Sequence, residues 1–192
     1  MKLILNFLLS LVTFSVNAGN IVDTTFKTQV LISQNNGEIS GCGVRFVGVQ
    51  DFTLNKQTVR LVDGSFSVFT SGSALTKLGM SKTNSSEILN GNQNSTQISI
   101  KSYWMRRLGG KITKPIGGKS TPSKDTKGFL LQVVEVDDFI DLMKVVNSDT
   151  EFQVGVTTLN EKEEWIFAGK LSTSPTDSER LGDCLKNISE SK

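Results

Sequence analysis

The chain has 192 residues, with 21 lysines and arginines against 19 aspartates and glutamates, so its formal net charge at pH 7 is +2. This near balance gives no general attraction to nucleic acid, which we do not expect as a partner. The chain contains no histidine, which excludes Ser-His-Asp and Cys-His catalytic groups and histidine-based zinc sites from within it. We expect no metal and no other cofactor.

Residues 1–18 have the layout of a cleavable secretory signal peptide. Lys2 supplies a positive start, residues 3–16 are mostly apolar, and small residues precede a cleavage point after Ala18. The apolar run is shorter than the ~20 residues that span a bilayer. A lipoprotein carries a cysteine beside its cleavage point, and this chain has none there. We predict a periplasmic or secreted protein whose mature part, residues 19–192, is one domain without a transmembrane segment.

The first part of the mature chain alternates apolar and polar residues. Residues 24–32 and 42–49 both show this pattern, which is typical of half-buried β-strands. The polar cluster at 33–40 separates them. We therefore predict a β-hairpin here.

Residues 57–72 predict a second hairpin, because Asp63-Gly64 suits the positive φ angles of a tight turn. The Ser- and Asn-rich residues 81–97 predict a long polar loop. Alternation returns at 97–107, which predicts another strand.

Residues 108–128 are rich in Gly, Pro and Lys and contain almost nothing to bury, so we predict a flexible basic loop at 106–127. A buried strand follows at 129–136. Helical spacing with acidic residues in the first turn predicts a short helix near 137–146. Residues 151–171 alternate on both sides of a polar turn and predict a further hairpin.

The end of the chain predicts a helix near 176–188. Thr176 and Glu179 have the spacing of a capping box. The apolar face recurs at i, i+3, i+4 and i+7, and it consists of Leu181, Cys184, Leu185 and Ile188. The cysteine therefore lies on the face that we expect to be buried.

The two cysteines of the chain, Cys42 and Cys184, lie near opposite ends of the mature part. A catalytic or redox thiol needs a nearby second cysteine or a histidine to ionise it, and neither is present. In an oxidising compartment two cysteines are more often paired. We predict a structural Cys42–Cys184 disulfide.

These elements predict a mostly β protein. Sequential hairpins without repeated βαβ units favour an antiparallel β-sandwich or a partly open barrel of about seven to nine strands. One short helix near 137–146 and one C-terminal helix near 176–188 complete the expected fold.

The strongest local feature is the basic segment 101–127, which carries eight basic residues against one acid, Asp125. Cationic side chains beside exposed aromatic rings can hold an anionic partner. The alternative is a solvated loop, with Trp104 buried in the core. The candidate partner-binding residues are Lys101, Tyr103, Trp104, Arg106, Arg107, Lys111, Lys114 and Lys119.

We predict an exported, non-enzymatic binding or accessory protein of the bacterial cell envelope that engages a protein or an anionic glycan or lipid partner. Two alternatives stay open. One is a structural or surface subunit that self-associates through strand edges. The other is a carboxylate-dependent hydrolase, for which the acids are Asp137, Asp138, Asp141, Glu161, Glu163 and Glu164. The sequence favours a solvated turn or a helix N-terminus for these acids.

Overall fold

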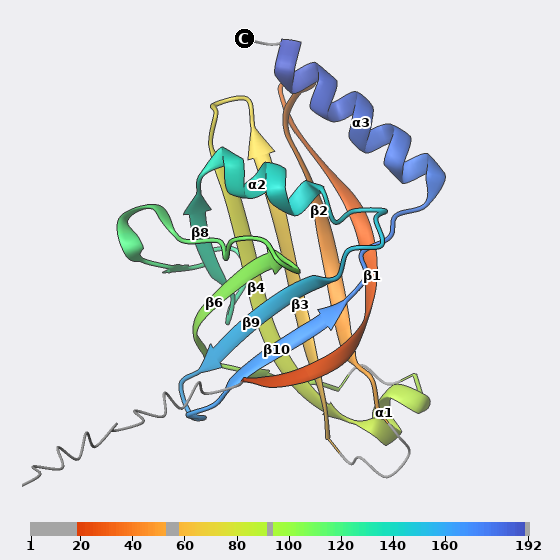
Figure 1. The fold of residues 1–192 in the computed structure, drawn as a ribbon, viewed down its shortest axis with the longest axis vertical. Helices are drawn as coiled ribbons and strands as arrows, with labels where there is room; N and C mark the ends of the chain where they lie inside the picture. Colours follow the sequence, from red (N-terminus) through yellow and green to blue (C-terminus); the bar gives the residue numbers. More distant parts are fainter. Residues whose placement is uncertain (1–18, 53–57, 92–93, 191–192) are drawn as a thin grey trace, which may run out of the picture.

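The computed structural model describes residues 19–52, 58–91 and 94–190. The predicted signal peptide, residues 1–18, lies outside these ranges. The described residues form ten strands and three α-helices (Figure 1), so the expectation of a mostly β fold is confirmed. The strands belong to one open, curved sheet rather than to two separate sheets. The partly open barrel is therefore the better of the two expected descriptions.

The order of strands in the sheet is β6-β9-β10-β1-β2-β3-β4-β8-β7, with β5 paired to β4 beside this path. Most neighbours are antiparallel, whereas β1 pairs in parallel with β10. The bounds are β1 Asn20–Asn35, β2 Glu38–Gln50, β3 Thr58–Phe69, β4 Ala74–Asn84, β5 Thr96–Ile98, β6 Ile100–Arg107, β7 Thr121–Pro122, β8 Leu130–Val134, β9 Phe152–Thr158 and β10 Glu164–Gly169.

The hairpins predicted at the two ends of the chain are present. β1 and β2 meet through Asn36 and Gly37, which both have positive φ angles (53° and 84°). Such a turn matches the right-handed twist of the flanking strands. β9 and β10 form the other hairpin, paired from Phe152 opposite Gly169 to Thr157 opposite Glu164.

The hairpin predicted at Asp63-Gly64 is wrong, because β3 runs unbroken through both residues. Gly64 lies against the packed interior. A Cβ at this position would lie 2.5 Å from Phe46 and 2.7 Å from Leu78. The glycine is therefore needed for close packing within a strand. The Asp-Gly dipeptide occurs here for that reason and not because the chain turns.

The helices fit the sequence pattern at two of three places. α2, Val136–Met143, and α3, Pro175–Glu190, lie where helices were expected. The predicted polar loop at 81–97 is more ordered than expected, since it contains the end of β4, the short helix α1 (Ser85–Leu89) and β5. No helix in the described part of the chain is long and apolar enough to cross a bilayer.

Phenylalanine side chains fill the concave side of the sheet. Phe152 lies at their centre, with ring centroids 5.5 Å from Phe26, 5.0 Å from Phe46 and 6.2 Å from Phe66. Phe139 of α2 adds a further edge contact to Phe66 at 6.2 Å. α2 thus covers one opening of the sheet and brings its own aromatic ring into the core (Figure 1).

The predicted disulfide is present. Cys42 of β2 and Cys184 of α3 are bonded, and both are buried. α3 packs against β1 and β2, and Leu181 and Ile188 are buried on the same face of the helix. The bond therefore attaches the C-terminal helix to the strand pair that begins the fold.

The outer edge of β6 is closed by other parts of the chain. The backbone N–H of Met105 donates to Thr113 Oγ1, and the backbone N–H of Thr113 donates to the Met105 carbonyl, both at 2.9 Å. Gln132 of β8 donates its side-chain N–H to the Tyr103 carbonyl at 2.9 Å. These contacts occupy backbone groups that a second chain would need for strand addition.

Candidate binding surfaces

The candidate residues of β6 divide between the two faces of the sheet. Tyr103 points into the core and is 4% exposed, and its hydroxyl lies 2.9 Å from Thr76 Oγ1. This contact joins β6 to β4 across the opening of the curved sheet. Tyr103 is thus part of the packed interior and does not present its ring to a partner.

Tyr103 gives a direct test of this burial, since it is the single tyrosine in the 192-residue chain. Burial raises its pKa well above the ordinary value of 10, although the hydrogen bond with Thr76 opposes the shift. The folded state therefore holds the phenolic proton more tightly than the unfolded state. This stabilisation is fully present below pH ~10 and is lost as the pH rises above the unfolded pKa.

We expect the phenolate absorbance to appear only as the protein unfolds at alkaline pH, whereas in urea it appears with a midpoint near pH ~10. Absorbance titration with parallel circular dichroism measures both transitions. Y103F provides the control, because it should show no phenolate signal. A phenolate that forms near pH ~10 while the dichroism is still native would contradict the buried position.

Trp104 and Arg106 lie on the opposite side of β6 from Tyr103 and are partly buried. Trp104 covers Gly155, where a Cβ would lie 2.0 Å from the indole ring. Its Nε1–H donates to Glu164 at 2.7 Å. The Arg106 guanidinium lies 4.9 Å from the centroid of the Trp104 ring and donates to Gln153 at 2.8 Å. These side chains connect β6 to β9 and β10.

Arg107 connects the end of β6 to α2. Its Nε–H donates to Asp141 Oδ1 at 2.8 Å, and Lys144 donates to the same oxygen at 3.3 Å. Partial burial raises the pKa of Asp141, but the hydrogen bonds from Arg107 and Lys144 outweigh it and lower the pKa overall. Arg107 is therefore committed to a contact within the fold.

The lysines of the basic segment behave differently from its arginines. All of them are exposed, and within the described ranges none has a carboxylate oxygen within 4.0 Å of its ammonium group. These residues are Lys101, Lys111, Lys114, Lys119, Lys124 and Lys127. The basic segment thus contains fixed arginines and solvated lysines, a division that the sequence pattern does not reveal.

The part of the segment at 117–127, which we call the lysine arm, carries Lys119, Lys124 and Lys127 and lies along β8, with which its residues Thr121 and Pro122 pair as β7. It is held at several points. Thr113 before it is 3% exposed and bonded to Met105, and within it the Ser123 N–H donates to the Phe129 carbonyl at 2.8 Å. The Thr126 hydroxyl accepts from Lys77 at 2.7 Å. The arm therefore presents its lysines from a loop that is attached to the barrel within the arm as well as before it.

A recess of about 510 Å³ lies beside the arm. One wall is the loop between β6 and the arm, and the other is the start of α2. We call it the apolar recess, although both charges occur at its rim. Its lining residues are Lys111, Ile112, Lys114, Pro115, Ile116, Glu135 and Asp138.

A second hollow crosses the convex face of β2, β3 and β4. It consists of adjoining recesses of about 630 Å³ and 350 Å³, which share Arg45, Asp63 and Phe129. Arg45 and Asp63 form a two-pronged ion pair at 3.0 Å and 2.7 Å. This hydrogen bond to Asp63 is the main cause of the raised pKa of Arg45. The pair satisfies both charges within the protein.

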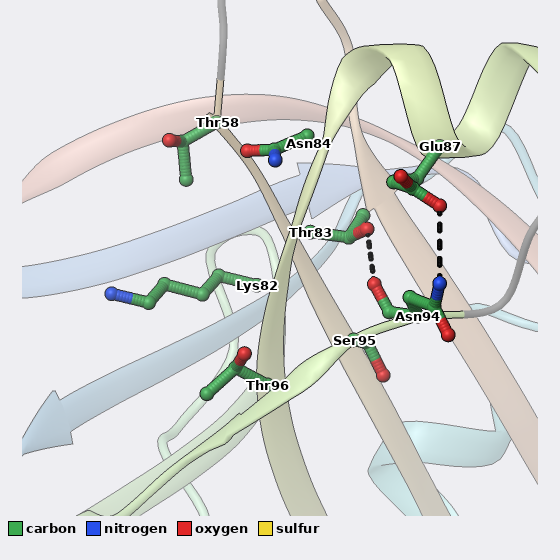
Figure 2. A pocket seen from close by; sticks show the side chains of 8 residues that line it. All are labelled: Thr58, Lys82, Thr83, Asn84, Glu87, Asn94, Ser95 and Thr96. Atoms are coloured by element: carbon green, nitrogen blue, oxygen red, sulfur yellow. Dashed lines mark hydrogen bonds between the residues drawn. The ribbon is translucent and has the colours of Figure 1, made fainter.

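A polar pocket of about 500 Å³ lies where β3 begins and β4 ends (Figure 2). Thr83 Oγ1 donates to the Asn94 carbonyl at 2.6 Å, and the Asn94 side chain donates to Glu87 at 3.4 Å. Figure 2 shows Lys82 extending on the other side of the strand from this pair. These hydrogen bonds attach the segment after α1 to β4. Thr83, Glu87 and Asn94, three of the polar residues that line the pocket, are thus bonded to one another.

Sequence reasoning missed the apolar recess. Ile112 and Ile116 are 37% and 52% exposed, and Glu135 and Asp138 belong to a different segment. The signal available in the sequence was the presence of two isoleucines in an otherwise polar, lysine-rich loop. Their exposure could not be predicted, because it depends on where α2 lies.

In the described part of the chain, no group of three or more Cys, Asp or Glu residues is placed to hold a metal ion. Comparison of the whole chain with protein-family models, curated proteins and solved structures finds no match. The exposed surfaces of the described residues are therefore the features that indicate a function.

Proposed function

We propose that this chain is an exported, non-enzymatic binding or accessory protein of the cell envelope, which engages an anionic partner through the lysine arm. The observation that carries the proposal is the contrast between the cations of the basic segment. Arg106 and Arg107 are used inside the fold, whereas Lys119, Lys124 and Lys127 are exposed and lack a carboxylate within 4.0 Å in the described residues.

Unpaired, exposed lysines suit a contact that forms and breaks. An exposed ammonium group keeps its hydration, so it costs the free protein little and can attract an anionic surface before contact. The attraction acts over about 8 Å at physiological salt and weakens as salt rises. Binding through the lysine arm should therefore be salt-dependent.

The disulfide supports the exported location. Disulfides form and persist in oxidising compartments, such as the periplasm or the exterior. The Cys42–Cys184 bond joins segments that are far apart in the chain. It fits the predicted signal peptide, and both features favour a role in the envelope.

The contacts of the acidic residues favour binding over hydrolysis. Asp141 pairs with Arg107 and Lys144, and Glu161 accepts hydrogen bonds from Arg60 and Trp165. Glu164 accepts the Trp104 N–H. A carboxylate-dependent glycoside hydrolase needs one carboxyl group with a raised pKa beside an ionised one, whereas the pKa of Asp141 is lowered.

The test is capture of partners from envelope extract by the mature chain and by K119Q/K124Q/K127Q, at low salt and at about 0.15 M salt. The matched control, K27Q/K82Q/K162Q, removes the same charge from exposed lysines elsewhere. We expect the arm variant to lose most of the captured partner, and the control to retain it.

Equal capture by all three proteins would show that the lysine arm is only a solvated loop. Equal loss from both variants would assign the capture to net charge rather than to the arm. Digestion of the captured material with protease or with glycan hydrolases then distinguishes a protein partner from an anionic polymer.

A further inference from the structure

The apolar recess has an unusual arrangement of charge. Its loop wall carries Lys111 and Lys114, and its helix wall carries Glu135 and Asp138. Basic residues therefore face acidic residues across the same hollow. The backbone N–H of Lys114 donates to Asp138 Oδ2 at 3.5 Å and so joins the two walls. Within the described ranges, however, neither the Lys111 nor the Lys114 ammonium group lies within 4.0 Å of a carboxylate, so the side-chain charges of the two walls do not form ion pairs with one another.

Apolar side chains of the loop wall also line the recess. Ile112 and Ile116 line the recess and are 37% and 52% exposed. Leu108 and Ile140, which lie close to these walls in sequence, are also about half exposed. An apolar centre with a charged rim is the usual anatomy of a protein–protein contact.

We propose that the apolar recess is the contact face of a two-fold symmetric dimer of this chain. A two-fold rotation places the loop wall of one copy against the helix wall of the other. Lys111 and Lys114 then face the partner copy's Glu135 and Asp138, and the same contacts occur a second time. Ile112 and Ile116 enter the centre of the interface. Such an interface must be complementary to itself, as this surface is.

The charge pattern favours a second copy over an unrelated partner. A purely acidic partner would attract the loop wall and be repelled by the helix wall, and a purely basic one would do the reverse. In a two-fold pair every charge meets its opposite. The lysine arm differs from this surface, because it carries three lysines and one acid and suits an anionic partner. The dimer proposal does not depend on the function proposed above.

The test uses two variants with inverted walls, studied by sedimentation velocity over a range of concentrations. K111E/K114E makes both walls acidic, and E135K/D138K makes both walls basic. We expect the wild type to dimerise as concentration rises, with a dissociation constant that increases with salt. Each variant alone should stay monomeric, and an equimolar mixture should form a heterodimer, because every pair of facing walls is then opposite in charge.

Three controls keep the outcome clear. K119E/K124E makes the same charge change on the lysine arm and should still dimerise. I112S/I116S leaves every charge in place and should weaken the dimer at least tenfold, so the proposal can be tested even where an inverted helix wall does not fold. Circular dichroism identifies such a variant.

The proposal is overturned by a wild type that stays monomeric at its highest attainable concentration, or by a mixture that stays monomeric although both variants are folded. A dimer that K119E/K124E abolishes and K111E/K114E leaves intact would move the interface to the arm and overturn the proposal as well. Loss of partner capture by K119Q/K124Q/K127Q has no bearing on these results, since that variant leaves the recess unchanged.

Discussion

Reduction of the Cys42–Cys184 bond is expected to lower the free energy of unfolding by about 2–5 kcal/mol. The two cysteines are separated by 142 positions in the chain. A bond across so long a loop restricts the unfolded chain strongly, and this restriction is lost on reduction. In the folded state α3 would then be held by packing, chiefly through Leu181 and Ile188, and by the hydrogen bond from Asn147 to Ser178.

Urea unfolding of the mature protein with and without reductant measures the effect. C42A/C184A should resemble the reduced wild type and should not respond to reductant. Because Cys42 and Cys184 are buried, the alanine variant also loses some packing and should be slightly less stable than the reduced protein. Unfolding midpoints that agree in oxidised and reduced wild type would contradict a stabilising role.

Truncation of Phe152 is expected to be as damaging. Phe152 is fully buried and makes ring contacts with Phe26, Phe46 and Phe66. F152A leaves a cavity at the point where these rings meet, and it removes edge-to-face contacts. We expect a loss of about 3–5 kcal/mol in the free energy of unfolding.

The matched control for this change is I21A, an apolar truncation on β1, where the side chain is 66% exposed. We expect it to change the free energy of unfolding by less than about 0.5 kcal/mol. F152L, which keeps an apolar side chain, should fall between the two. A loss below about 1 kcal/mol for F152A would show that Phe152 is not central to the core.

Much of the fold was predictable because it depends on local pattern. The alternation in residues 24–32 and 42–49 predicted β1 and β2, and the i, i+3, i+4, i+7 spacing around Cys184 predicted the buried face of α3. Asn36-Gly37 lies in the turn that was expected between the first two strands. In each case, side chains a few positions apart decide which face of the element can be buried.

The candidate binding residues were predictable only as a set. The sequence shows that the segment 101–127 is basic, and the lysines are indeed exposed. The alternation over 97–107 predicts a strand there, but it does not show which partners Tyr103, Arg106 and Arg107 meet. Their contacts with Thr76, Gln153 and Asp141 are made by residues 27 to 47 positions away. Such long-range contacts depend on the curvature of the sheet.

By itself, then, the sequence determined the β-rich character of the chain, the positions of α2 and α3, and the pairing of its two cysteines. Each follows from periodicity, from capping or from the lack of any other partner. The tertiary structure alone decided that Asp63-Gly64 continues a strand, that β1 joins β10 in parallel, and that the arginines of the basic segment, rather than its lysines, bond to other side chains of the described residues. The physical reason is the same in all three cases. Each depends on residues that are distant in the chain. Gly64 is needed because Phe46 lies beside it, β1 meets β10 because the sheet curves, and Arg107 is paired because Asp141 lies next to it.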